Sequence, residues 1–131
     1  MTITRDEVYK RLSHILIEAF KVDEEEVQLP ATLLGDLGLE SIDFLDLIFR
    51  LERQFGIKIP RGELFPESIF QGDPEMVKGG RVTDKGMAEL RMRMPFADLR
   101  AFDKIREIAQ ISDLFTVELV YKYVCSKLGI Q

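Results

Sequence analysis

The feature that most constrains the fold is the segment from residue 41 to residue 55, which is apolar around most of a helical circumference. Its polar residues recur at helical spacing and form one stripe: Asp43, Asp46, Arg50 and Arg53. The acids precede the bases, which suits the dipole of a helix running from Ser41 to Phe55, and Gly56 supplies a left-handed terminator. A helix with so little polar surface must be covered on several sides. The segment therefore predicts the centre of a helical bundle.

The loop before this helix contains Gly35 and Gly38 and ends in Glu40 and Ser41. A serine hydroxyl accepts hydrogen bonds from the free N–H groups at a helix start, so capping is the simplest role for Ser41. Capping does not account for the acidic residues on both sides of it or for the lack of a base nearby in the sequence. This context predicts a serine that another enzyme modifies.

At residues 35–48 the chain reads Gly-Asp-Leu-Gly-Leu-Glu-Ser-Ile-Asp-Phe-Leu-Asp-Leu-Ile, which resembles the attachment segment of acyl carrier proteins. The resemblance continues through Arg50–Pro60, which ends in the Phe-Gly-Ile-x-Ile-Pro phrase typical of that family. Ile111–Val117 is similar to the opening of the family's final helix. The usual attachment triplet is Asp-Ser-Leu, so Glu40 and Ile42 depart from it while keeping its charge and apolarity.

The resemblance implies a 4′-phosphopantetheine arm, taken from coenzyme A, on the hydroxyl of Ser41. The thiol of that arm, and no group of the protein, would hold an acyl group as a thioester. Implied partners are a phosphopantetheinyl transferase and acyl-loading, acyl-transfer or elongation enzymes. The pathway stays open between fatty-acid, lipid and secondary-metabolite biosynthesis, although the modest charge and extra length favour a specialised carrier.

Two sets of side chains near this helix are candidate contact residues. The acidic residues that would dock basic grooves on partner enzymes are Glu40, Asp43 and Asp46. The apolar residues that could line a cavity for an acyl chain are Ile42, Leu45, Ile48 and Phe49.

A first and a last helix flank this centre. Thr4 with Glu7 three residues later is a capping-box pattern, and the apolar face that follows comprises Val8, Leu12, Ile15, Leu16, Ala19 and Phe20. His14 falls on the polar side, where solvation is expected. The last helix begins after Thr116, and Cys125 on it is expected to be a small packing residue.

Residues 61–111 have no counterpart in ordinary carriers, and without these 51 residues the chain would have 80, about the size of a standalone carrier domain. Residues 62–80 are rich in Gly and Pro and predict loops. Helices are expected at 83–94, where Gly86 weakens the pattern, and at 98–109. The expected fold is all-α: a single acyl-carrier-like domain over 1–131, with three main helices, short ones, and one or two extra helices from the insertion.

Two roles for the insertion remain open. Its apolar residues could enlarge or cover an acyl cavity: Phe96, Leu99 and Phe102. Its basic residues could dock a dedicated partner: Arg91, Arg93, Arg100 and Arg106.

Charge and composition exclude several classes of function. The net charge of −5 lies within residues 1–60, and an acidic surface disfavours nucleic acid. No apolar run approaches the roughly 20 residues of a membrane helix, and the N-terminus lacks the apolar core of a secretory signal. A single cysteine allows no internal disulfide, which suits a reducing compartment. We expect a cytoplasmic monomer that is not embedded in a membrane.

Catalysis by the chain itself is not expected. The sequence has one His and one Cys, and shows no nucleophile motif, phosphate-binding loop or metal-ligand spacing. No metal site and no catalytic residue are predicted. The alternative that remains beside a carrier is an unmodified, carrier-like protein-interaction module. An unrelated small enzyme would require a cluster of titrating groups that the single His argues against.

Overall fold

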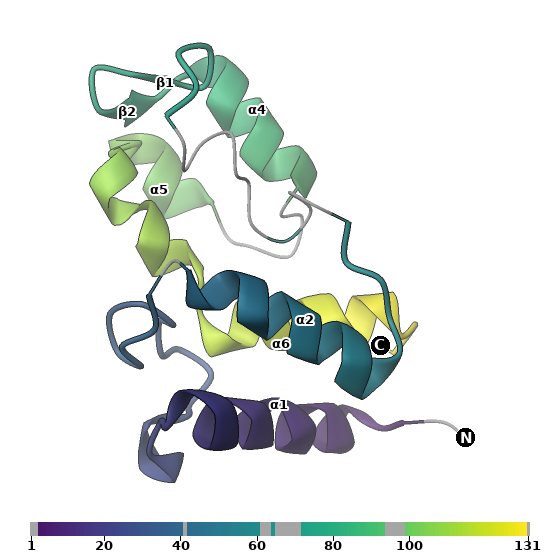
Figure 1. Ribbon diagram of the computed structural model, residues 1–131. Coiled ribbons are helices and arrows are strands. Elements are labelled where there is room, and N and C mark those ends of the chain that lie inside the picture. Colours follow the sequence, from purple (N-terminus) through teal and green to yellow (C-terminus); the bar gives the residue numbers. More distant parts are fainter. Residues whose placement is uncertain (1–2, 41, 61–63, 65–71, 94–98, 131) are drawn as a thin grey trace. The chain divides into compact units, whose positions relative to one another are not determined.

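The computed structural model describes residues 3–40, 42–60, 64, 72–93 and 99–130. The chain divides into two compact units (Figure 1). Unit 1 comprises Met1–Ile59 and Phe115–Gln131, and unit 2 comprises Pro60–Leu114. Unit 2 interrupts unit 1 in sequence, close to the bounds expected for the insertion. The expectation that residues 1–131 form a single domain stays a prediction.

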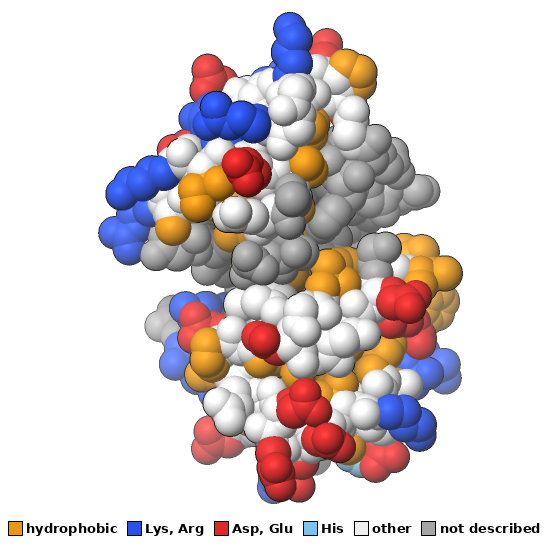
Figure 2. Space-filling view, turned by 90° about the vertical axis from the view of Figure 1, so that its left-hand side faces the viewer, with side chains coloured by type: hydrophobic (Ala, Val, Ile, Leu, Met, Phe, Trp, Pro, Cys, Tyr) orange, Lys and Arg blue, Asp and Glu red, His pale blue; other side chains and the backbone are white. Residues whose placement is uncertain are grey.

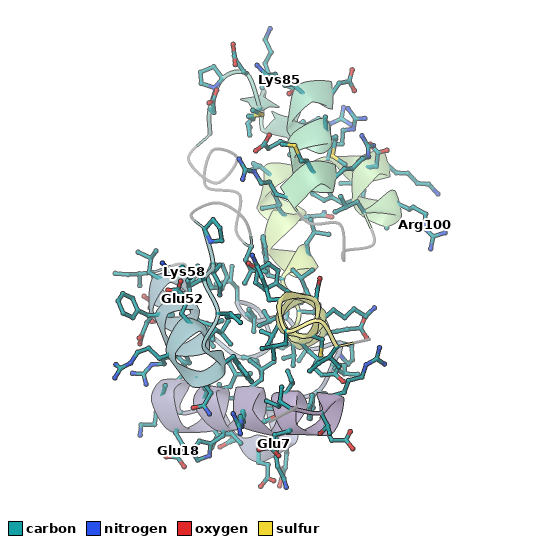
Figure 3. All side chains as sticks on the ribbon, turned by 90° about the vertical axis from the view of Figure 1, so that its right-hand side faces the viewer. Glu7, Glu18, Glu52, Lys58, Lys85 and Arg100 are labelled. Atoms are coloured by element: carbon teal, nitrogen blue, oxygen red, sulfur yellow. The ribbon has the colours of Figure 1, made fainter. Side chains whose placement is uncertain are left out.

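Helix α1, Arg5–Phe20, begins at the predicted cap. The Thr4 hydroxyl accepts the N–H of Glu7 at 3.2 Å, while the Glu7 carboxylate binds Arg11 instead of completing the capping box (3.1 Å). The buried residues follow helical spacing and are Val8, Leu12, Ile15 and Leu16. Glu7 and Glu18 point away from the bundle (Figure 3), and His14 is exposed as expected. This face packs against α2, Asp43–Phe55, and α6, Val117–Lys127.

Helix α2 buries one side and ends at Gly56 with φ 64°, as predicted. Its buried residues are Phe44, Leu47, Leu51 and Phe55, and the ring of Phe44 lies 5.8 Å from that of Phe115. Beyond the helix, the Glu52 carboxylate accepts the N–H of Ile59 at 2.9 Å and holds the returning chain. Glu52 and Lys58 lie near each other at this end of α2 (Figure 3).

Helix α6 is capped by Thr116, whose hydroxyl accepts the N–H of Leu119 at 3.1 Å. The residues that it buries are Val117, Leu119, Val120, Tyr123, Val124 and Cys125. The packing role predicted for Cys125 is confirmed, since its side chain is 6% exposed. Burial raises the pKa of this thiol, as expected where solvent cannot stabilise a thiolate.

Unit 2 contains a hairpin that the sequence interpretation missed, formed by β1, Val77–Lys78, and β2, Arg81–Val82. Helix α4, Asp84–Arg93, follows it and is capped by Thr83, which accepts the N–H of Gly86 at 3.1 Å. A Cβ at Gly86 would collide with Met76 O and Val82 Cγ1. Glycine within this helix is therefore required by close packing on the hairpin.

Helix α5, Arg100–Ile105, is shorter than the predicted span of 98–109. Arg106 takes a left-handed conformation, φ 57°, and ends the helix. The reason is tertiary: the carbonyl of Arg106 accepts the N–H of Val82 at 2.7 Å, and Ile108 donates to Gly80 at 2.9 Å. These bonds draw the chain beside the hairpin, and a 3₁₀ helix follows at Ile108–Leu114.

The mostly helical fold class is confirmed, with helices α4 and α5 as the extra elements of unit 2 and a small hairpin beside them. Each unit buries apolar side chains, and the described ones buried in unit 2 are Leu64, Val82, Met87, Leu90, Leu99, Phe102 and Ile111. Among the described helices, none is both long and apolar enough to cross a membrane.

Candidate functional site

The loop that leads to α2 is shaped by a reciprocal pair of side-chain bonds. Thr32 donates its N–H to Asp36 Oδ2 at 2.9 Å, and Asp36 donates its N–H to Thr32 Oγ1 at 3.0 Å. The hydroxyl of Thr32 would lie only 2.9 Å from a Cβ placed at Gly35. Such a contact is shorter than real Cβ atoms show, so a side chain at position 35 would displace the Thr32 hydroxyl that Asp36 binds.

The same loop is attached to the beginning of α6. Leu33 donates to the carbonyl of Phe115 at 2.8 Å, and Val117 donates to that of Ala31 at 2.9 Å. The first N–H groups of a helix lack partners within the helix, and here a loop carbonyl satisfies one of them. The loop is consequently fixed to the start of α6 within unit 1.

The final turn of the loop delivers the chain to α2. Gly38 has φ 75°, and Leu39 is buried and donates to Leu33 O at 3.0 Å. The N–H of Glu40 then donates to Asp43 Oδ2 at 2.8 Å, while the N–H of Asp43 donates to Glu40 O at 2.9 Å. These two bonds join the residues that bracket position 41. Ser41, the predicted attachment residue, lies outside the described residues.

The three acidic docking candidates have different surroundings. Glu40 is exposed. Asp43 is half-buried, and its carboxylate is engaged by the backbone of Glu40. Asp46 forms an exposed ion pair with Arg50, 3.1 Å between Oδ1 and Nε. Asp43 and Asp46 lie in the first turn of α2, where the helix dipole favours negative charge.

The apolar candidates do not share the buried face of α2. Ile42, Leu45 and Phe49 are 69%, 63% and 65% exposed, and Ile48 is half-buried. The expectation that α2 is covered on several sides is wrong for this second face. The spacing of the exposed residues, i, i+3 and i+7, is as regular as that of the buried set, so sequence periodicity alone could not separate the two faces.

Other reactive side chains lie apart from this loop. Cys125 lines a surface hollow of about 340 Å³ with Arg5, Tyr121, Lys122, Ser126 and Ile130. Burial also raises the pKa of the Tyr121 hydroxyl. Within the described residues, no group of three or more His, Cys, Asp or Glu side chains is arranged to hold a metal ion.

The family model described as "Phosphopantetheine attachment site" matches residues 10–67, a stretch that includes the loop and α2. The acyl carrier protein of Thermotoga maritima is 36% identical over 61 residues, which are 47% of this chain and 75% of that protein. The chain belongs to the acyl carrier protein family. The acyl carrier protein of Petrotoga mobilis is 36% identical over 62 residues, 47% of this chain and 73% of that protein.

The relatives differ in how much of their length is matched. Acyl carrier protein AcpXL of Rhizobium meliloti is 36% identical over 52 residues, which are 40% of this chain and 55% of that protein. Thus the chain spans little more than half the length of this relative. The family match ends at residue 67, early in unit 2.

Membership of this family establishes two of the predictions made from the sequence. Acyl carrier proteins are carriers and not catalysts, and their prosthetic group is 4′-phosphopantetheine. The described neighbours of position 41 fit such a group, because Glu40 and Ile42 are both exposed. The space beside Gly38 is also open, since a Cβ placed there would meet no atom within 4 Å.

Sequence reasoning missed the residues that fix this loop. Thr32 and Asp36 were not singled out, although a Thr and an Asp four residues apart in a glycine-containing loop are a recognisable turn signal. Asp43 was interpreted only as a docking residue, and its bond to the backbone of Glu40 gives it a structural role as well.

Proposed function

We propose that Ser41 carries the 4′-phosphopantetheine arm and that the protein holds acyl intermediates for biosynthetic enzymes. When bound, the arm supplies a terminal thiol that takes an acyl group as a thioester. The observation that carries the proposal is the pair of hydrogen bonds between Glu40 and Asp43. These bonds bracket position 41 at the start of α2, inside the region that matches the attachment-site family.

The protein contributes two things to this function: a fixed loop before position 41 and charged groups around that position. The bonds of Thr32 and Asp36, and those of the loop to α6, fix the loop against unit 1. The first turn of α2 places its positive dipole end near position 41, which favours an anionic phosphodiester. Glu40 and Asp46 are exposed and are proposed to meet basic grooves on partners, whereas Asp43 also stabilises the loop.

The partners proposed are a phosphopantetheinyl transferase and acyl-loading, acyl-transfer or elongation enzymes. The exposed positions of Ile42, Leu45 and Phe49 favour contact with a partner or cargo at the surface of α2. Their membership of an internal acyl cavity stays a prediction, as do the pathway, the cytoplasmic location and the monomeric state.

Unit 2 is proposed to be an insertion in the carrier fold. Of the residues suggested to extend an acyl cavity, Leu99 and Phe102 are buried within unit 2, and Phe96 lies outside the described residues. The described structure thus gives Leu99 and Phe102 a packing role of their own. Whether they also affect an acyl chain stays a prediction.

Three of the four basic side chains suggested to dock a partner form ion pairs within unit 2. Arg91 and Arg106 bind Asp103, and Arg93 binds Glu89. Arg100 projects outward from α5 (Figure 3). A docking role for any of these four arginines stays a prediction.

Intact mass after incubation with coenzyme A and a phosphopantetheinyl transferase tests the attachment. We expect the mass of one arm on the native chain and on Ser126→Ala, a control at an exposed serine of α6, but none on Ser41→Ala. Addition to Ser41→Ala would place the arm elsewhere. If transferases from several sources, including the source organism, added nothing to the native chain, the unmodified interaction module would be the better description.

A further inference from the structure

The hairpin of unit 2 brings two like charges together. Lys78 and Arg81 are directly opposite each other in the register of β1 and β2. Gly79 and Gly80, with φ 61° and 77°, form the two-residue turn between them. Directly opposed side chains share one face of a hairpin, and like charges there destabilise it. The arrangement is unfavourable unless something negative lies between the two cations.

These two cations line a surface hollow of about 440 Å³ within unit 2. The residues around the hollow come from the hairpin and from the end of α5, and they are Lys78, Arg81, Val82, Thr83, Asp103 and Arg106. Arg81 is held against α5 by a bond from Nε to the carbonyl of Ile105, 3.3 Å. Figure 2 shows Lys and Arg side chains gathered on the surface of the part that contains β1, β2 and α5.

The third cation of the hollow is already neutralised. Arg106 binds Asp84 at 2.6 Å and Asp103 at 2.7 Å, and Asp103 also binds Arg91 at 3.0 Å. Two arginines and two aspartates therefore form a network without net charge. The hydrogen bond to Arg106 is the main cause that lowers the pKa of Asp103, so this network persists at neutral pH.

Lys78 and Arg81 stand outside that network. Neither forms an ion pair with any residue that the structure describes, and the Arg81 bond to Ile105 uses only one of its five N–H groups. The hollow thus presents two positive charges that form no ion pair with the residues that the structure describes. The Lys78 ammonium is a compact point charge, and the Arg81 guanidinium is a planar group whose N–H donors suit phosphate or carboxylate oxygens.

We propose that this hollow binds the phosphate group of a small phosphate monoester. Such a group carries roughly −1.5 to −2 charges at pH 7 and three acceptor oxygens, which matches Lys78 and Arg81, whereas a carboxylate would balance only one of them. At about 440 Å³ the hollow falls within the size range of ligand pockets, which begins at about 300 Å³. It therefore has room for part of the organic group beside the phosphate.

The test is an NMR titration of the ¹⁵N-labelled full chain with inorganic phosphate, adenosine monophosphate and adenosine, all at constant ionic strength. We expect saturable shifts of the amides of residues 78–83 and 106–108 with both phosphates and none with adenosine. The double variant Lys78→Gln/Arg81→Gln should bind about tenfold or more weakly, because charge-assisted bonds to phosphate are the strong ones. Tighter binding of adenosine monophosphate than of phosphate would show that the organic group is also held.

The matched control removes the same charge elsewhere in unit 2. Lys85 is paired with Glu75 and Lys104 is exposed on α5, and neither lines the hollow. Lys85→Gln/Lys104→Gln should keep the affinity for phosphate. Equal weakening in both double variants, equal shifts with adenosine, or no saturation with either phosphate would overturn the proposal. The substituted side chains are exposed, and unchanged shifts at Met87 and Phe102 would verify the fold.

Discussion

At the scale of single residues, Gly38 determines how the loop reaches α2. Its φ of 75° lies in the left-handed region, while a Cβ there would meet no neighbour. A side chain at position 38 therefore introduces backbone strain without a clash. We expect Gly38→Ala to lower the free energy of unfolding of unit 1 by about 1–2 kcal/mol, the usual cost of this conformation.

Denaturant unfolding of the purified variants measures this cost. Gly38→Asn is the matched control, because asparagine tolerates left-handed backbone better than alanine, and it should fall between the native chain and Gly38→Ala. Equal stability of native chain and Gly38→Ala would show that the turn can adopt another conformation. The rate of arm attachment should fall in the same order if Ser41 is presented by this turn.

Cys125 provides a second prediction at this scale. Its side chain is buried, and burial raises the pKa of the thiol, so little thiolate forms near neutral pH. We expect slow reaction of the native chain with 5,5′-dithiobis(2-nitrobenzoate) at neutral pH. Attachment of the arm should add one fast thiol, absent from Ser41→Ala. Fast reaction of the unmodified chain would show that the end of α6 opens readily.

The prediction of attachment at Ser41 stays a prediction, because Ser41 lies outside the described residues. Gly35, Gly38 and the acidic residues around Ser41 are the local signals on which that prediction depends. The bond from Glu40 to the Asp43 carboxylate was not predictable, because an acid in the first turn of a helix satisfies the dipole rule whether or not it also bonds to the backbone.

At the scale of elements, the start of α6 connects two parts of unit 1. The Thr116 hydroxyl accepts the N–H of Leu119, and a backbone bridge pairs Thr116 with Thr32 of the loop. We expect Thr116→Ala to destabilise unit 1 by about 1 kcal/mol, the typical effect of losing such a cap. Thr116→Ser keeps the hydroxyl and should lower the free energy of unfolding by a smaller amount. Chemical denaturation distinguishes the two, and an Ala variant as stable as the Ser variant would contradict the capping role.

Element prediction succeeded where local signals were sufficient. The caps at Thr4 and Thr116 and the terminator at Gly56 were predicted, and each appears in the structure. The hairpin was missed although two glycines between short β-type segments are a turn signal. The early end of α5 depends on a bond from Val82 to Arg106, 24 residues apart in sequence, so no local pattern could reveal it.

At the scale of the whole molecule, the two units are stabilised by different interactions. Unit 1 buries long apolar faces of α1, α2 and α6. Unit 2 combines shorter elements with the ion-pair network of Arg91, Arg106, Asp84 and Asp103. A count of net charge could not reveal this network, because its two arginines and two aspartates cancel in the sum. A pH change should therefore affect the units unequally.

The direction follows from Asp103, whose pKa in the folded chain lies below its ordinary value of 3.8, chiefly because Arg106 donates a hydrogen bond to it. The unfolded chain takes up this proton at higher pH, so the stabilisation is present above about pH 3.8 and is lost as pH falls through the folded value. Hydrogen exchange between about pH 5 and pH 3 should show unit 2 amides such as Val82 losing protection, corrected for intrinsic exchange. In Asp103→Asn, the protection of unit 2 amides should depend less on pH. Glu107→Gln is the control, because it removes an exposed acid of the same unit and should keep the pH dependence of the native chain. An unchanged profile in Asp103→Asn would mean that other carboxylates carry the acid sensitivity of unit 2.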